Sequence, residues 1–330
     1  MLLLISPRDA IYISMPRRIR LRLLKDPRKN IAKSRNRPQK QKKQRLQKME
    51  EIDYEVRPEV LTYEDIREMV PKLDGHEKLV NRVLHWLKVD LVNETHARIC
   101  DTPGPEFVKR LLFEEFKIKL RVDNEQVLDH LPEGAFITVS NHPFGAIDGI
   151  TLIYLISSRR PKFKVMVNFI LNKISAMRPN LIAVDAWHSD DPAKRAVSVN
   201  GIRQTMRQLA DGEPMGFFPA GAMSNTNWKG QPIDKEWQKS VLQIIYKAKL
   251  PVIPIFFHGK NSWISNFLGH ACWQARSLRL PAEMFRKRGK EVHVSIGDII
   301  WPEEQEAHRE SPETLGAYLR EKTYALRANK

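Results

Sequence analysis

The sequence predicts an α/β protein with a mostly parallel central sheet flanked by helices. From residue 117 onward, short apolar runs alternate with longer stretches of helical periodicity. The runs expected as strands cover residues 135–140, 163–167, 181–185, 215–218, 252–257 and 292–296. The stretches expected as helices between them include residues 146–157, 193–210 and 236–248. This alternation is typical of βαβ units, which build a parallel sheet covered on both faces.

The region before this alternation has helical patterns over residues 61–116, where apolar residues from Leu79 to Leu91 recur at helical spacing. We therefore expect a helical N-terminal portion over residues 49–116 and one α/β domain over residues 117–330. The apolar face of the N-terminal helices either packs on the core or enters a membrane surface, because Trp and Leu stand among Lys and Arg there.

The positive charge of the chain is concentrated at its beginning. The formal net charge is +16, and the first 48 residues hold 16 Lys and Arg against two acids, which makes +14. This segment shows neither helical nor strand periodicity, so we expect residues 1–48 to be a disordered basic arm. Basic arms attract nucleic acid or anionic lipid surfaces.

Cysteine usage and hydropathy restrict the cellular setting. Cys100 and Cys272 have no metal-ligand spacing, which favours free thiols over a disulfide framework or a zinc site. The chain has no apolar run of the roughly 18 residues that a membrane span requires. The opening residues 1–7 lack the layout of a secretory signal. We expect a cytoplasmic protein that is peripheral to the inner face of the cell membrane.

The strongest functional pattern is the segment Ser140–Gly149, which joins an expected strand to an expected helix and contains His142 and Asp148. The carboxyl end of a strand is where open α/β sheets place their ligands. His142 is suited to act as a general base, and Asp148 would hold its Nδ1–H from the first turn of the helix. The alternative is a turn with a structural histidine and a helix-capping aspartate.

Two later segments accompany this motif. Gly216–Ser224 reads as a strand that runs into a turn of small residues, whose backbone N–H groups could bind a phosphate or an oxyanion. Leu250–Gly259 reads as a buried strand with two prolines.

In this order and at these distances, the three segments resemble the glycerolipid acyltransferase superfamily typified by bacterial 1-acylglycerol-3-phosphate acyltransferase. The resemblance covers residues 117–300. It implies that His142 is the general base, that Asp148 orients it, and that the acceptor hydroxyl attacks the donor thioester without a covalent intermediate. It also implies acceptor binding near Gly221 and Ser224.

The chain departs from the family pattern in ways that bear on the acceptor. Five residues separate the His and the Asp where the family has four, Ala220 replaces a Glu, and Met223 replaces an Arg. A second family Arg is missing near residues 182–187, so both bidentate phosphate clamps are absent. The spacing and the Phe-Pro-Ala-Gly turn are similar to ornithine- and glycine-lipid O-acyltransferases and haemolysin-like proteins. We expect a lyso-aminolipid acceptor first and a lysophospholipid second.

These expectations define an enzyme of lipid metabolism and phospholipid biosynthesis. Its donor would be acyl-carrier protein or acyl-coenzyme A as a co-substrate, with no cofactor and no metal. Its partners would be the lipid acceptor and an anionic membrane surface. The residues expected to bind substrate are Asn141, Phe144, Gly145, Phe218, Pro219, Gly221, Ser224, Lys229, Asn261 and Ser262.

Other candidates are less specific. A polar loop after the turn contains Lys229, Asp234, Lys235 and Trp237, which either contact a headgroup or have no role. His258 ends the next strand and is read as structural. The apolar stripe at residues 263–268 is either core or a membrane-facing surface. Asp190 and Asp191 are expected as helix N-terminal charge and not as metal ligands.

Two other classes of function stay open. A nucleic-acid or ribosome-binding protein could act through the basic arm, but the arm lacks interleaved aromatic residues and any known recognition fold. A lipid hydrolase could use the same His and Asp to activate water, although no Gly-x-Ser-x-Gly nucleophile motif is present.

Overall fold

The computed structural model describes residues 55–185, 192–227, 230–271 and 273–328. Residues 55–330 form one compact unit. The expected basic arm, residues 1–48, lies outside the described residues, as do Cys272, Lys229 and the Asp190–Asp191 pair.

The central sheet has seven strands in the order β1-β9-β8-β2-β5-β3-β4. All neighbouring strands run parallel except β8 and β9, which are antiparallel. The expected fold class is therefore confirmed. The strands are β1 (Lys119–Asp123), β2 (Ile137–Ser140), β3 (Lys164–Asn168), β4 (Leu181–Val184), β5 (Met215–Phe217), β8 (Val252–His258) and β9 (Glu291–Ile296), and a small hairpin is formed by β6 (Asn225–Thr226) and β7 (Pro232–Ile233).

Helices precede, connect and follow the strands. The α-helices are α2 (Tyr63–Met69), α3 (Glu77–Trp86), α4 (Val89–Ile99), α5 (Pro105–Arg110), α6 (Ala146–Ser157), α7 (Pro192–Ala210), α8 (Lys239–Ala248), α9 (Trp263–Ala271), α10 (Trp273–Leu278), α11 (Leu280–Arg286), α12 (Pro302–Glu306) and α13 (Pro312–Ala325). Short 3-10 helices are η1 (Pro71–Leu73), η3 (Glu125–His130), η4 (Phe169–Lys173), η5 (Ser175–Asn180) and η6 (Leu326–Ala328), and η2 (Leu111–Glu115) is a π-helical turn that continues α5.

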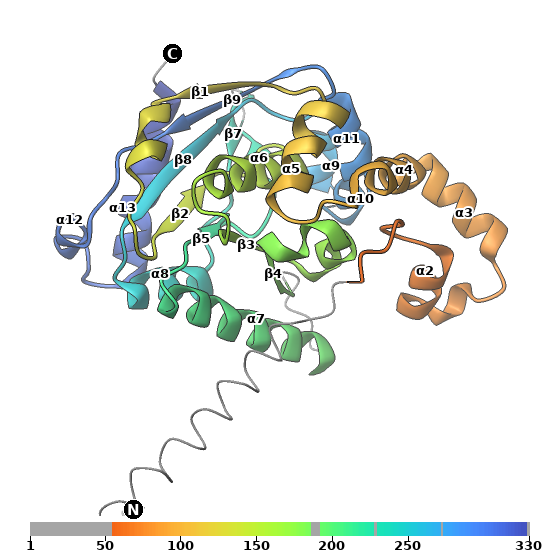
Figure 1. Ribbon diagram of the computed structural model, residues 1–330, viewed down its shortest axis with the longest axis horizontal. Helices are drawn as coiled ribbons and strands as arrows, with labels where there is room; N and C mark the ends of the chain where they lie inside the picture. The colour runs from red at the N-terminus through yellow and green to blue at the C-terminus, as the bar shows by residue number, and fades with distance from the viewer. Residues whose placement is uncertain (1–54, 186–191, 228–229, 272, 329–330) are drawn as a thin grey trace, which may run out of the picture. The chain divides into compact units, whose positions relative to one another are not determined.

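The two faces of the sheet bury separate hydrophobic clusters. Helices α5 and α6 cover one face, where Phe107, Ile153 and Phe257 share a cluster (Figure 1). Helices α8 and α13 cover the other face, where Leu242 and Leu319 pack on the strands. Strand β2 lies in the middle and is buried on both sides, which is why it reads as a continuous apolar run.

Strand β1 was not predicted from the sequence. Its polar residues Lys119, Arg121 and Asp123 alternate with Leu120 and Val122, and it is an edge strand that pairs only with β9. A strand with one solvated face and one exposed edge needs few apolar residues. Its pattern is therefore too short and too polar to separate from a loop.

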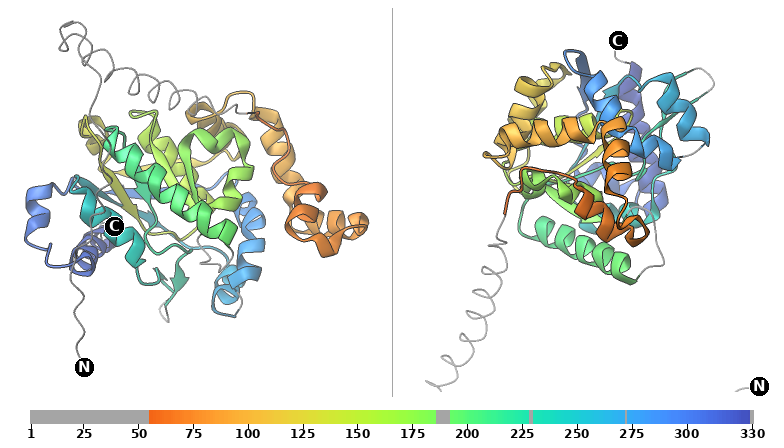
Figure 2. Two further views of the ribbon diagram at one scale, coloured as in Figure 1. Left: turned by 90° about the horizontal axis from the view of Figure 1, so that it is seen from below. Right: turned by 90° about the vertical axis from the view of Figure 1, so that its right-hand side faces the viewer.

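The N-terminal helices α2 and α3 lie at one end of this unit, away from the sheet (Figure 2). The expected helical run is broken at Lys88, which adopts a left-handed backbone with φ of 64° and separates α3 from α4. On α3, Leu79, Val83 and Trp86 are exposed. None of the helices in the described part of the chain is long and apolar enough to span a bilayer.

Candidate active site

His142 stands at the carboxyl end of the central strand β2, and its backbone is held from both sides. Its N–H lies 3.3 Å from both Ser224 Oγ and Asp234 Oδ1. Its carbonyl accepts the Ser224 N–H at 2.8 Å. The position of the imidazole is thus fixed by a turn that follows β5, more than 80 residues further along the chain.

Asn141 joins β2 to the neighbouring strand β8. Its amide nitrogen donates to the Phe257 carbonyl at 2.9 Å, and its oxygen accepts the Phe257 N–H at 2.7 Å. The side chain is buried and does not line the cavity described below. Asn141 therefore closes the gap between two strands where the ladder ends, and its contact with substrate stays a prediction.

Asp148 is the third residue of α6 and is fully buried. Its Oδ2 accepts the backbone N–H groups of Phe144 and Gly145, both at 2.9 Å, and lies 3.0 Å from His142 Nδ1. The distance to Nδ1 is that of an ion pair, but the ring N–H is not aligned well enough for a good hydrogen bond. Catalytic hydrogen bonds are often poorly aligned before substrate binds, so the geometry is compatible with an orienting role.

The tight turn between these two residues depends on Gly145, whose φ is +86°. A Cβ added there would lie 2.6 Å from Leu280 Cδ1 and 2.7 Å from Met223 Sδ. Glycine therefore serves two needs at this position, a left-handed backbone and the close approach of α11 and of the turn after β5.

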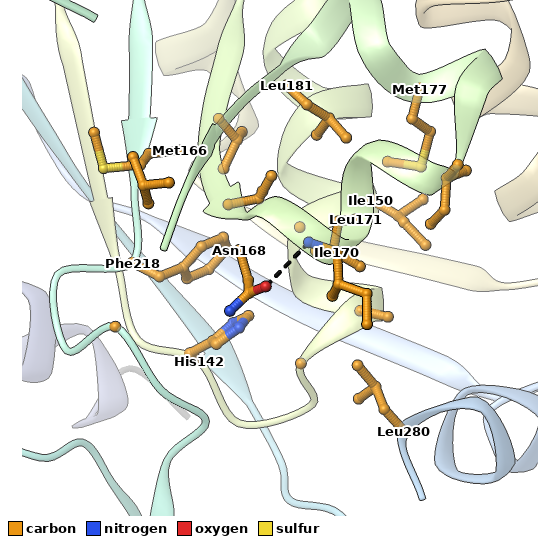
Figure 3. Close-up of a pocket in the computed structure, with 18 of the residues that line it drawn as sticks. His142, Ile150, Met166, Asn168, Ile170, Leu171, Met177, Leu181, Phe218 and Leu280 are labelled. Atoms are coloured by element: carbon orange, nitrogen blue, oxygen red, sulfur yellow. Dashed lines mark hydrogen bonds between the residues drawn. The ribbon is translucent and has the colours of Figure 1, made fainter. Parts of the chain in front are cut away.

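A large apolar cavity of about 1040 Å³ opens beside His142. Figure 3 shows His142 and Phe218 on one side of it, with Ile150, Leu171 and Leu280 across from them. Helices α4 and α5, the first turns of α6, and strand β3 all contribute to its wall. A cavity of this size is at the upper end of the range for small-molecule sites, and its lining suits a hydrocarbon chain.

Phe218 packs directly on the imidazole. The two ring centroids are 4.1 Å apart, with an angle of 32° between the ring planes. Phe218 follows β5, so the phenyl ring and the backbone contacts of Ser224 come from the same turn. Gly221, with a φ of +63°, also lines the cavity, whereas Pro219 is buried and its carbonyl accepts the Gln238 N–H.

Asp234 lies behind His142 and does not face solvent. Ser224 Oγ donates to Asp234 Oδ1, and the Asp234 N–H donates to Tyr324 Oη at 2.8 Å. Burial raises the pKa of the Asp234 carboxyl, and the hydrogen bond from Ser224 acts in the opposite direction. The interpretation of this loop as a polar headgroup site does not hold for Asp234 or Trp237, because both are buried.

Arg276 of α10 supports the turn after β5. Its guanidinium is buried and donates to the carbonyls of Met223 and Ser224, at 3.3 and 2.7 Å, and to Asn225 Oδ1 at 3.0 Å. No local pattern in the sequence indicates this role, because Arg276 is more than 50 residues from its partners. Three acceptors occupy this Arg within the described residues.

Asn261 and Ser262 lie on the far side of the motif. Asn261 donates to the Phe144 carbonyl at 3.2 Å, and Ser262 binds the buried Glu283 through its N–H at 3.0 Å and its hydroxyl at 2.5 Å. Asn261 thus holds the backbone of the motif, whereas Ser262 ties this segment to the side chain of Glu283 on α11, and neither residue lines the cavity.

A separate group of side chains has the composition of a metal site. Asp123, His258 and His293 offer donor atoms within 4.8 Å of one another, and imidazole with carboxylate suits Zn²⁺. Ser295 Oγ donates to Asp123 Oδ2 at 2.8 Å and bonds His258 Nε2 at 2.7 Å, and His293 Nε2 lies 2.5 Å from the same carboxylate oxygen. These contacts form a network that links β1, β8 and β9, and none of these four residues lines the cavity.

The fold and this arrangement agree with a comparison against protein families. The family model described as "Acyltransferase" matches residues 66–330, so the chain belongs to this acyltransferase family. The resemblance that the motifs indicated is confirmed at the level of the family.

Two relatives of this chain carry names that specify an acceptor. The chain is 29% identical over 257 residues to a lyso-glycine lipid O-acyltransferase of Bacteroides thetaiotaomicron. The matched segment covers 75% of this chain and 88% of that protein. It is 26% identical over 257 residues to the same-named protein of Phocaeicola vulgatus, with 75% and 87% covered. Among solved structures, the 1-acyl-sn-glycerophosphate acyltransferase of Thermotoga maritima is similar at a TM-score of 0.44 and 17% identity, over 76% of this chain and 87% of that one.

Proposed function

We propose that this acyltransferase moves a fatty acyl group from a thioester donor to the free hydroxyl of a lysolipid. The observation that carries the proposal is the His142–Asp148 pair at the opening of a large apolar cavity. The proposed acceptor is a lyso-aminolipid, and the names of the two relatives support a lyso-glycine lipid in particular. The proposed donor is acyl-carrier protein or acyl-coenzyme A.

In the proposed mechanism, His142 Nε2 takes the proton of the acceptor hydroxyl while its oxygen attacks the thioester carbonyl carbon. Asp148 stabilises the imidazolium that forms, because its carboxylate oxygen lies 3.0 Å from Nδ1. The tetrahedral intermediate then collapses, the carbon–sulfur bond breaks, and the imidazolium returns the proton to the thiolate. No residue of the protein is acylated.

The experiment that tests this function is an assay of the purified protein with a lyso-glycine lipid and a labelled acyl thioester. Mass spectrometry of the products should show the diacylated lipid and the free thiol. Free fatty acid as the main product would instead identify a hydrolase. In cells that lack the protein, the monoacyl lipid should accumulate.

The cavity should determine which acyl chains are accepted. Ile153 lies one turn beyond Gly149 on α6 and lines the cavity. Replacing Ile153 with Trp should exclude part of a long chain. Each methylene that loses its burial costs about 0.8 kcal/mol, so losing two lowers the preference for the longer chain roughly tenfold.

This shift is measured by competition between donors of different chain length in one reaction. Ile153→Val, which removes a methylene without blocking the cavity, serves as the matched control and should keep the native preference. If the Trp variant folds, transfers acyl groups and discriminates chain length as the native enzyme does, the cavity does not hold the acyl chain.

We further propose that the enzyme works at an anionic membrane surface. Trp86 of α3 is 72% exposed, and Trp263 and Phe267 of α9 are 77% and 63% exposed. Exposed aromatic side chains are costly in water and are typical of surfaces that enter the headgroup layer. These positions favour the surface interpretation of the stripe at residues 263–268 over the core interpretation.

Replacing both Trp263 and Phe267 by Ala should therefore lower binding to vesicles that contain anionic lipid by about tenfold or more, since each side chain would bury its apolar area. Co-sedimentation with vesicles measures the bound fraction. The exposed Val199 and Met206 of α7 provide a control pair of apolar residues on another helix. Equal effects of both pairs would argue against a specific membrane-binding face.

A further inference from the structure

Beside the catalytic motif lies the ammonium group of Lys287, which forms no ion pair with a carboxylate of the described residues. Lys287 follows the last residue of α11, and its Nζ is 3.9 Å from the centroid of the Phe144 ring. Phe144 is two residues beyond His142, and its backbone N–H is bound by Asp148. Lys287 donates one hydrogen bond, to the Lys260 carbonyl at 3.2 Å, which leaves capacity for further acceptors.

The helix that ends at Lys287 also forms part of the cavity wall. Leu280, labelled in Figure 3, and Met284 both line the cavity. Residues at positions i, i+4 and i+7 of a helix share one face, so Lys287 continues the face that Leu280 and Met284 begin. Lys287 itself does not line the cavity, so along this face the apolar wall formed by Leu280 and Met284 is followed by an ammonium group just outside it. This spatial order of an apolar surface and a positive charge matches a substrate with a hydrocarbon chain and an anionic headgroup.

The acids near Lys287 are already engaged. Glu283 accepts both the N–H and the hydroxyl of Ser262, and Asp148 accepts two backbone N–H groups. Among the described residues, no carboxylate forms an ion pair with Lys287. Burial lowers the pKa of the Lys287 ammonium, and the charge of Asp148 acts in the opposite direction. A half-buried ammonium with no direct ion pair keeps part of its desolvation cost, and a substrate anion would offset that cost.

Arg276 is also a cation near the motif, but it does not fit this role. Arg276 is buried under the turn after β5, where its two terminal guanidinium nitrogens already donate to two carbonyls and an amide oxygen of that turn. The two positions of that turn which depart from the family pattern, Ala220 and Met223, carry no charge.

We propose that Lys287 binds the headgroup carboxylate of the acceptor, which makes acidic lysolipids the substrate class of the enzyme. This inference rests on the proposed lysolipid acylation. A glycine headgroup carries one carboxylate, so a single ammonium is a sufficient counter-charge. Lys287 is then a specificity-determining residue that places the acceptor, while His142 and Asp148 perform the chemistry.

The test compares two acceptors that differ by one charge, a lyso-glycine lipid and its methyl ester. Lys287→Met keeps the length of the side chain and removes its charge. It should lower kcat/KM for the free acid by about 10- to 100-fold, mainly through KM, because a hydrogen bond to a charged group contributes on that scale. The methyl ester should be used by the variant and the native enzyme within a factor of two. Lys287→Arg should recover part of the activity on the free acid.

Lys290→Met is the matched control, because Lys290 is an exposed residue of the same basic segment. It should use both acceptors as the native enzyme does. An equal loss on the acid and the ester would overturn the proposal, and so would an effect of Lys287→Met confined to the KM of the donor, which would place the donor's phosphate there. If the native enzyme acylates neither acceptor, the proposed function itself fails. That result can be distinguished from the two outcomes that would overturn only the role of Lys287.

Discussion

Replacing His142 by alanine should reduce kcat for acyl transfer by about 10²- to 10⁴-fold, which is the usual contribution of a positioned general base. The neutral acceptor hydroxyl that remains is a poor nucleophile toward a thioester. The protein should still fold, because the contacts of this residue with Ser224 and Asp234 are made by its backbone N–H and carbonyl. Single-turnover assays with saturating donor measure the loss.

His130→Ala is a suitable control, since His130 is exposed and, within the described part of the chain, its ring bonds only the Gln126 carbonyl one turn earlier in the same short helix. It should retain native activity. Chemical denaturation should show the two variants within about 1 kcal/mol of each other, apart from the loss of the Phe218 ring contact in His142→Ala. A His142→Ala protein with native turnover would refute the general-base mechanism.

Asp148→Asn should also be strongly impaired, with kcat lowered by roughly 10²- to 10⁴-fold, because a neutral amide neither stabilises an imidazolium nor fixes the same tautomer. This variant should lose stability as well. Asp148 Oδ1 has no hydrogen-bond partner in the described structure, so an amide N–H₂ placed there would be buried without an acceptor. Such a group costs about 1–3 kcal/mol.

The two effects can be separated by measuring kcat well below the melting temperature, together with urea denaturation of the same preparation. Asp129→Asn provides an exposed control, because this carboxylate forms a surface ion pair with Arg159 and lies outside the motif. If Asp148→Asn loses stability but keeps native kcat, the role of Asp148 is limited to capping α6.

Local sequence patterns predicted the central part of this molecule well. Helix α6 begins at Ala146 and ends at Ser157, as its apolar period indicated, and β2 was recognised because a central strand is buried on both faces. The His142 and Asp148 positions could be singled out because turn, histidine and helix start are contiguous in the chain. Such features depend on residues within one or two turns of each other, and sequence periodicity reports on that range.

The surroundings of the motif were harder to predict, because they are made by residues far apart in the chain. Asp234, Arg276 and Lys287 look like ordinary charged loop or helix residues until the fold brings them against the motif. The large cavity has no sequence signature either, since its wall combines apolar residues from many elements, each of which also reads as core. Burial of a charge is a tertiary property and is not encoded in spacing.

One carboxylate oxygen of Asp148, Oδ2, caps the first turn of α6 and also lies against His142. Fraying of that turn would therefore release the imidazole even while the rest of the sheet stays intact. Local opening of this kind requires less free energy than global unfolding. On heating, this acyltransferase should therefore lose its activity at a temperature below the one at which its sheet melts. The temperature of inactivation would then measure the stability of the first turn of α6.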